Sequence, residues 1–150
     1  MKMGSNNALC ICGKTGCLGN EVSGHALEGA YRQAIEQKTG RNFADNIRYD
    51  EILQLALNGD HTATKLIEML GENLGKALGN MLNLLNPELI VIGGKFVRVR
   101  HILEGPVLRG MESTALQNAL KTCELDFSDM GELAGLKGAG SLVFEQFDMI

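Results

Sequence analysis

Apolar side chains recur at helical spacing along the first half of the chain. Over residues 20–38 they fall about one helical turn apart, and Gly40 follows as a helix stop signal. A shorter stretch, residues 49–60, has the same periodicity, and Gly59 is expected to end its helix. We therefore expect two helices here, preceded by a loop over residues 1–17 that is rich in Gly, Asn and Cys.

The third periodic stretch, residues 60–85, is the longest. Asp60 can cap its first turn because a carboxylate accepts hydrogen bonds from free backbone N–H groups. Glycines recur every fourth residue beside the apolar face, which weakens a helix but lets another element approach closely. We expect the apolar face to pack into the core. It consists of Ala63, Leu66, Ile67, Leu70, Leu74, Ala77, Leu78, Met81 and Leu85, beside Gly71, Gly75 and Gly79.

The second half of the chain changes to an α/β pattern. Pro87 ends the long helix, and the apolar, β-branched run over residues 89–92 predicts a strand buried on both faces. We expect a second strand over residues 123–129, a helix over 106–120 between the strands, and a last helix after a Gly-rich turn from Gly131. Two strands make a poor sheet, so another chain, or a second copy of this one, is expected to complete it.

Composition places the chain among ordinary globular proteins. Its 150 residues are 45% hydrophobic and 21% charged, which is enough apolar material for a core. The net charge of -4 argues against direct contact with nucleic acid, since such proteins carry a basic face. No apolar stretch is long enough to span a membrane and the start lacks a signal-peptide core, so we expect a cytoplasmic protein with reduced thiols.

Three of the four cysteines lie close together near the start of the chain: Cys10, Cys12 and Cys17, in the motif Cys-x-Cys-Gly-x-x-Gly-Cys. The intervening glycines permit positive φ angles, so the loop can turn all three sulfurs inward. Zinc takes thiolates in tetrahedral sites and can hold a loop that has no core of its own. We favour zinc; reduced structural cysteines or an adventitious disulfide are the alternatives.

A tetrahedral zinc site needs a fourth ligand. Cys123 falls in a predicted strand and is expected to be a core residue, as free cysteines usually are. His25 is the nearest histidine but lies on the following helix, and His61 and His101 are far away in sequence. The fourth ligand is therefore a histidine, a water molecule or a group from elsewhere.

Three motifs together resemble the C-terminal half of the ROK proteins, a family of repressors, open reading frames and sugar kinases. They are the cysteine motif over residues 10–17, NPELIVIGG over 86–94 and AGLKGAGSL over 134–142. The resemblance covers essentially the whole chain. It implies an α/β chain that forms the C-terminal part of an actin-like, ribonuclease-H-like ATPase fold, with an incomplete sheet.

The resemblance also implies how the chain is divided. Residues 1–19 would form a zinc-binding loop, 20–85 a helical segment and 86–150 an α/β segment. ROK kinases phosphorylate a hexose with ATP through a phosphate loop and a catalytic aspartate in an N-terminal portion, so no catalytic residue is expected here. The family's fourth zinc ligand is a histidine ahead of the first cysteine. This chain starts at about the following residue, as a truncated product, a misassigned start or a cut fragment would.

One position departs from the family pattern. ROK proteins follow the cysteine motif with a glutamate that hydrogen-bonds the sugar, and this chain has Gly19 there. Losing such a charge-assisted hydrogen bond costs about 1.5–3 kcal/mol. Glu21 is a candidate replacement if the start of the helix rearranges; otherwise it is a solvated carboxylate favoured by the helix dipole.

Four glycines match positions near the nucleotide of the family: Gly93, Gly94, Gly135 and Gly138. Helix N-termini at such turns attract phosphate. The same glycines could equally serve packing alone, because strands and helices often need glycine where they meet a turn. Without the phosphate loop any nucleotide would bind poorly, so ATP is expected only for a full-length kinase.

The sequence and the family resemblance are consistent with three functions. The first is the sugar-sensing effector part of a ROK-type transcriptional repressor, not catalytic by itself, which Gly19 favours. The second is the C-terminal half of an ATP-dependent, glucokinase-like sugar kinase. The third is a zinc-stabilised module that acts only by oligomerisation. A homo-oligomer is expected because the sheet edge and the surface toward the absent lobe are apolar and unpaired. A helix-turn-helix upstream would support the repressor, and a glycine-rich phosphate loop the kinase.

Overall fold

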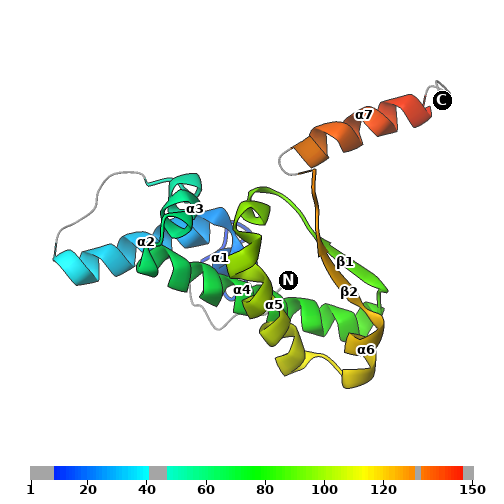
Figure 1. The fold of residues 1–150 in the computed structure, drawn as a ribbon, viewed down its shortest axis with the longest axis horizontal. Helices are drawn as coiled ribbons and strands as arrows, with labels where there is room; N and C mark the ends of the chain where they lie inside the picture. Colours follow the sequence, from blue (N-terminus) through cyan, green and yellow to red (C-terminus); the bar gives the residue numbers. More distant parts are fainter. Residues whose placement is uncertain (1–8, 41–46, 131–132, 147–150) are drawn as a thin grey trace.

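The computed structural model describes residues 9–40, 47–130 and 133–146. A body of packed helices is followed by a small parallel sheet and a last helix (Figure 1). The elements in chain order are α1 (Gly19–Val22), α2 (Gly24–Thr39), α3 (Tyr49–Leu57), α4 (His61–Leu85), β1 (Leu89–Ile92), the 3-10 helix η1 (Lys95–Val99), α5 (Arg100–Thr114), α6 (Gln117–Thr122), β2 (Glu124–Phe127) and α7 (Ala134–Gln146). None of the described helices is long and apolar enough to cross a membrane.

The predicted helix over residues 20–38 is two helices. The chain is extended at Ser23, whose hydroxyl accepts a hydrogen bond from the Ala26 N–H at 3.2 Å and so caps α2. The predicted stop is confirmed, since Gly40 ends α2 with a φ of 64°. The predicted cap of α4 is also confirmed, because the Asp60 carboxylate accepts from the Ala63 N–H at 2.7 Å.

The buried face of α4 differs from the predicted one at its end. The first part is confirmed, but Met81 and Leu85 are 37% and 64% exposed, and Leu82 is buried instead. The reason is that α5 lies along the glycine side of α4, where Gly71, Gly75 and Gly79 are buried. Leu82 follows on that side of the helix, whereas Met81 and Leu85 turn away from it.

Glycines bring the backbones of α4 and α5 into contact. A Cβ atom at Gly75 would lie 2.0 Å from the Val107 carbonyl oxygen, and one at Gly110 would lie 2.2 Å from the Glu72 carbonyl oxygen. Thr114 adds a hydrogen bond from its hydroxyl to the Lys76 carbonyl at 3.1 Å. The close approach predicted from the glycine spacing is therefore confirmed, and α5 is the element that makes it.

The helix predicted over residues 106–120 is wrong at both ends. The 3-10 helix η1 leads directly into α5, which therefore begins at Arg100 and contains Pro106 in its interior. At the other end Ala115 is extended and α6 starts anew. Asn83 of α4 stabilises this break, because its side chain donates to the Thr114 carbonyl and accepts from the Leu116 N–H.

The two predicted strands pair in parallel, with Leu89 opposite Glu124 and Ile92 opposite Phe127. Ile90, Ile92, Leu125 and Phe127 pack toward the helices. The expectation that the first strand is buried on both faces is wrong within this chain, since Leu89 and Val91 are 51% and 53% exposed. Only one side of the described sheet is covered by helices.

The turn after β1 and the last helix complete the fold. Gly94 has a φ of 83°, which confirms a tight turn that favours glycine. Gly135 and Gly138 lie within α7, not in a turn before it, and Gly131 falls outside the described residues. Figure 1 shows α7 at the end of β2, away from the helical body.

The contact between α4 and α5 can be tested with a pair of alanine substitutions. Gly75→Ala places a methyl group against backbone that cannot move aside, so we expect a loss of about 1–3 kcal/mol or more in the free energy of unfolding. Gly29→Ala is the control: a Cβ there meets nothing within 4 Å, and alanine should stabilise α2 by roughly 0.5–1 kcal/mol. Urea unfolding measures both; equal effects would contradict the packing described.

Candidate metal centre

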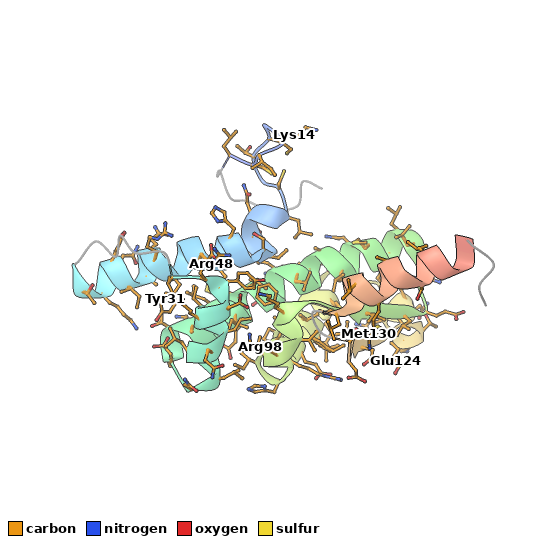
Figure 2. All side chains as sticks on the ribbon, turned by 90° about the horizontal axis from the view of Figure 1, so that it is seen from above. Lys14, Tyr31, Arg48, Arg98, Glu124 and Met130 are labelled. Atoms are coloured by element: carbon orange, nitrogen blue, oxygen red, sulfur yellow. The ribbon has the colours of Figure 1, made fainter. Side chains whose placement is uncertain are left out.

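The cysteine motif forms a loop that projects from the helical body, with Lys14 near its outer end (Figure 2). Leu9 and Thr15 form an antiparallel bridge at its base. Inside it the Cys10 N–H donates to the Lys14 carbonyl and the Gly13 N–H donates to the Cys10 carbonyl, each at 2.8 Å. Gly13 and Gly16 have φ angles of 78° and 70°, so the positive φ expected from the motif is confirmed.

The loop brings the sulfurs of Cys10, Cys12 and Cys17 together. All three Sγ atoms lie within 4.8 Å of one another, and those of Cys12 and Cys17 are 3.4 Å apart. In a tetrahedral zinc site with Zn–S bonds of about 2.3 Å, sulfurs are about 3.8 Å apart. The spacing therefore suits three corners of such a tetrahedron.

The thiols differ in exposure and in proton affinity. Cys17 is buried, Cys10 is partly buried and Cys12 is exposed. The Lys14 backbone N–H and the Cys17 thiol donate to the Cys12 sulfur, which lowers the pKa of Cys12. The same Cys17–Cys12 hydrogen bond raises the pKa of Cys17 to about 11. A divalent cation would stabilise the thiolate form of all three cysteines.

A fourth ligand is not found among the residues that the structure describes. Among those residues, the group whose ligand atoms lie close enough together to hold a metal ion consists of the three cysteines alone. The His25 side chain is 96% exposed, and its Nδ1 lies 3.5 Å from a Glu28 carboxylate oxygen. His61 and His101 are exposed on α4 and α5. Cys123 is partly buried beside β2, and this burial raises the pKa of its thiol.

A groove of about 640 Å³ lies beside the cysteine loop, between α1, α2 and α4. Glu21 lines it, and so does His25, which was considered above as a zinc ligand. The other polar residues that line it were not selected from the sequence: Asn20, Ser23, Gln33 and Asn73. No local signal singles out Asn73, because only the packing of α4 against the first two helices brings it there.

The position of Gly19 is sterically open. It is the first residue of α1, two residues after Cys17, and it is exposed. A Cβ there would meet no atom within 4 Å among the described residues, and its φ is not in the left-handed region. Neither packing nor backbone geometry therefore requires glycine at this position.

The four glycines selected as nucleotide contacts lie near the carboxyl ends of the strands. Gly93 and Gly94 follow β1, and Gly135 and Gly138 lie in the helix that follows β2. Ligands of open parallel sheets bind at this edge. A Cβ at Gly135 or Gly138 would meet nothing within 4 Å in the described part of the chain, so packing against that part does not explain these two glycines.

Sequence comparison identifies relatives over nearly the whole chain. The sequence model described as the ROK family matches residues 1–146. The glucokinase of Halalkalibacterium halodurans is 30% identical over 147 residues, which cover 93% of this chain and 44% of that protein. The N-acetylglucosamine repressor of Escherichia coli O6:H1 is 33% identical over 113 residues, 75% of this chain and 27% of that protein. The chain thus spans less than half the length of these relatives.

Solved structures of ROK family proteins superpose on this chain. A ROK family transcriptional regulator, a homologue of the E. coli MLC protein, superposes with a TM-score of 0.74 at 27% identity, covering 85% of this chain and 33% of its own. A ROK family glucokinase from Streptomyces griseus, in complex with glucose and AMPPNP, gives a TM-score of 0.79 at 24% identity, covering 95% of this chain and 49% of its own.

We predict that the purified chain holds about one zinc ion, because its three thiolates match a zinc tetrahedron. Cys17→Ser should remove most of the zinc, whereas Cys123→Ser should leave the content unchanged. Elemental analysis by mass spectrometry after dialysis measures both. A folded chain that carries no metal would show that the cysteines have another role.

Proposed function

The chain belongs to the ROK family, and from this premise we propose that it is the sugar-sensing effector part of a ROK-type transcriptional repressor, without catalytic activity of its own. The relatives include both repressors and glucokinases. The observation that carries the proposal is Gly19. It stands where the family motif has a sugar-binding glutamate, and nothing in the local structure demands a glycine.

The missing carboxylate bears on function because of where α1 lies. The helix begins directly after the cysteine loop and borders the groove between α1, α2 and α4. Gly19 directly precedes Asn20 and Glu21, which line the groove, and a Cβ at position 19 would meet no described atom within 4 Å. The absence of the glutamate weakens any sugar site by about 1.5–3 kcal/mol, which a sensor tolerates better than an enzyme that must hold its substrate rigidly.

Glu21 is the carboxylate that we propose as a partial substitute for the missing glutamate, as an acceptor for a sugar hydroxyl. It lines the groove together with Asn20 and Asn73, whose amides can both donate and accept. Sugar recognition needs several such groups, since each hydroxyl is a donor and an acceptor. The groove therefore offers hydrogen bonds of the right kind, with Gln33 at a further position.

Zinc would act here by holding the start of α1 in place. Cys10, Cys12 and Cys17 would bind the ion, and the Cys17 carbonyl accepts a hydrogen bond from the Asn20 N–H at 3.0 Å. Bound zinc would supply the structural link that a loop without a core lacks. The position of Asn20 and Glu21 then depends directly on Cys17.

The remaining assignments follow from the same premise. We propose that the chain forms the C-terminal part of an actin-like ATPase fold, divided into a metal loop over residues 1–19, helices over 20–85 and an α/β segment over 86–150. It makes no direct contact with DNA and assembles as a homo-oligomer in the full-length protein. Gly93, Gly94, Gly135 and Gly138 would border a nucleotide only if the whole protein is a kinase.

The alternative is the C-terminal half of an ATP-dependent sugar kinase, and one observation favours it. The glucokinase of H. halodurans matches 93% of this chain, whereas the E. coli repressor matches 75%. The two proposals differ in what the natural full-length product does. Sugar-dependent release of DNA supports the repressor, and ATP-dependent formation of a sugar phosphate supports the kinase.

Isothermal titration of this chain with glucose tests the role of Gly19. We expect a dissociation constant weaker than about 1 mM, because a charge-assisted hydrogen bond is missing. Gly19→Glu should tighten binding by about tenfold to 100-fold, the equivalent of one such bond. Gly19→Gln has nearly the same shape without the charge and should tighten binding less. Sub-micromolar binding by the unaltered chain would refute the proposal.

A further inference from the structure

The three thiols of the cysteine loop, residues 10–17, differ in their access to solvent. Cys12 is exposed, Cys10 is partly buried and Cys17 is 8% exposed. The loop projects from the helical body, and Ile11 beside Cys12 is fully exposed (Figure 2). Because the susceptibility of a cysteine to oxidation follows the exposure of its thiolate, a small oxidant in solution should react first at Cys12.

A partner for an oxidised Cys12 is already in place. The Cys17 Sγ lies 3.4 Å from the Cys12 Sγ, so the two sulfurs need to move only about 1.4 Å closer to reach the length of a disulfide bond. Gly13 and Gly16 stand between them, both with positive φ, and a Cβ at Gly13 would meet nothing within 4 Å in the described chain. Glycine adopts more backbone conformations than other residues, so this segment can close.

Cys10 is a less suitable partner for Cys12. Only one residue separates the two, so a bond between them closes a small, strained ring that is easily reduced again. Two backbone hydrogen bonds also fix the position of Cys10. Its N–H donates to the Lys14 carbonyl and its carbonyl accepts from the Gly13 N–H, each at 2.8 Å. Cys12 therefore pairs more readily with Cys17, which lies beyond this turn.

We infer that the cysteine loop is an oxidation site for hydroperoxides, at which Cys12 and Cys17 are converted to a disulfide. The Cys12 thiolate attacks one oxygen of hydrogen peroxide, the O–O bond breaks and hydroxide leaves, so that Cys12 becomes a sulfenic acid. The Cys17 thiolate then attacks the Cys12 sulfur, the S–O bond breaks and a second hydroxide leaves. The two sulfurs are oxidised and the peroxide is reduced: two thiolates, one peroxide and two protons give one disulfide and two water molecules.

The disulfide would also end the binding of zinc by the loop. Zinc is held by thiolates, and the oxidation consumes two of the three, leaving only Cys10 of this group. The Cys17 carbonyl accepts a hydrogen bond from the Asn20 N–H at 3.0 Å, so the change occurs at the start of α1, beside the groove. This consequence rests on the zinc site proposed above, whereas the formation of the disulfide does not.

Cys123 is an internal control for the selectivity of the reaction. It is partly buried beside β2 and is not one of the three sulfurs that gather in the loop. Burial raises the pKa of its thiol, which leaves less of the reactive thiolate. With one equivalent of peroxide, we expect Cys12 to be oxidised at least about tenfold faster than Cys123.

The experiment treats the purified chain, after its zinc content has been measured, with one equivalent of hydrogen peroxide. The remaining thiols are alkylated and the chain is digested with trypsin, which cuts after Lys14. Cys12 then falls in the peptide 3–14 and Cys17 in the peptide 15–32. A disulfide between them joins the two peptides, which mass spectrometry detects, and fragmentation of the joined pair identifies the bonded cysteine of the first peptide.

We expect the joined peptides to appear together with the release of about one zinc ion per disulfide, measured with a colorimetric indicator. A dithiol reductant with added zinc should reverse both changes. Cys10→Ser keeps the proposed pair and should still form it. Cys17→Ser removes the second thiol and should leave Cys12 as a sulfenic acid, which dimedone labels. Cys123→Ser should behave as the unaltered chain does.

A disulfide between Cys10 and Cys12 in place of the expected one, or equally fast oxidation of Cys12 and Cys123, would overturn the inference. Release of zinc with Cys17 still reduced would also overturn it. A chain that purifies without zinc but forms the disulfide between Cys12 and Cys17 would support the oxidation site and refute the zinc assignment alone. None of these readouts involves a sugar, so they are independent of the proposed role of Gly19.

Discussion

The fold depends on one contact, the approach of α4 and α5 until their backbones touch. Gly75 and Gly110 face each other across it, and a methyl group at either would collide with a carbonyl of the other helix. This contact fixes the direction of α5, and the core residues Leu103 and Val107 lie along it. The strand before α5 and the strand after α6 pair in parallel next to this contact.

Local sequence signals predicted the helices. Where a helix boundary differs from the prediction, contacts with residues distant in sequence are the reason. Gly40, Asp60 and Pro87 each act within a few residues of their own position, so the end of α2 and both ends of α4 could be predicted from the sequence. The start of α5 could not, because η1 turns the chain before Pro106 is reached. Its end also could not, since the side chain that replaces the lost helix bonds belongs to Asn83, over thirty residues away.

The candidate site also has one part that could be predicted from the sequence and one part that could not. Close spacing along the chain sufficed to group Cys10, Cys12 and Cys17, because a loop with two glycines has few ways to fold. The groove is different: Glu21 lies next to the motif, but Asn73 comes from the middle of α4. The exposed outer face of β1 was likewise not predicted, since its apolar pattern indicates a strand buried on both faces.

We propose that zinc bound by the cysteine loop of this ROK-family chain positions the start of α1. X-ray absorption at the zinc edge of the purified chain tests this most directly, since it reports which atoms surround the ion. The account predicts three sulfur neighbours at about 2.3 Å and one nitrogen or oxygen neighbour at about 2.0–2.2 Å. A shell of four sulfurs, or one of light atoms alone, would contradict it.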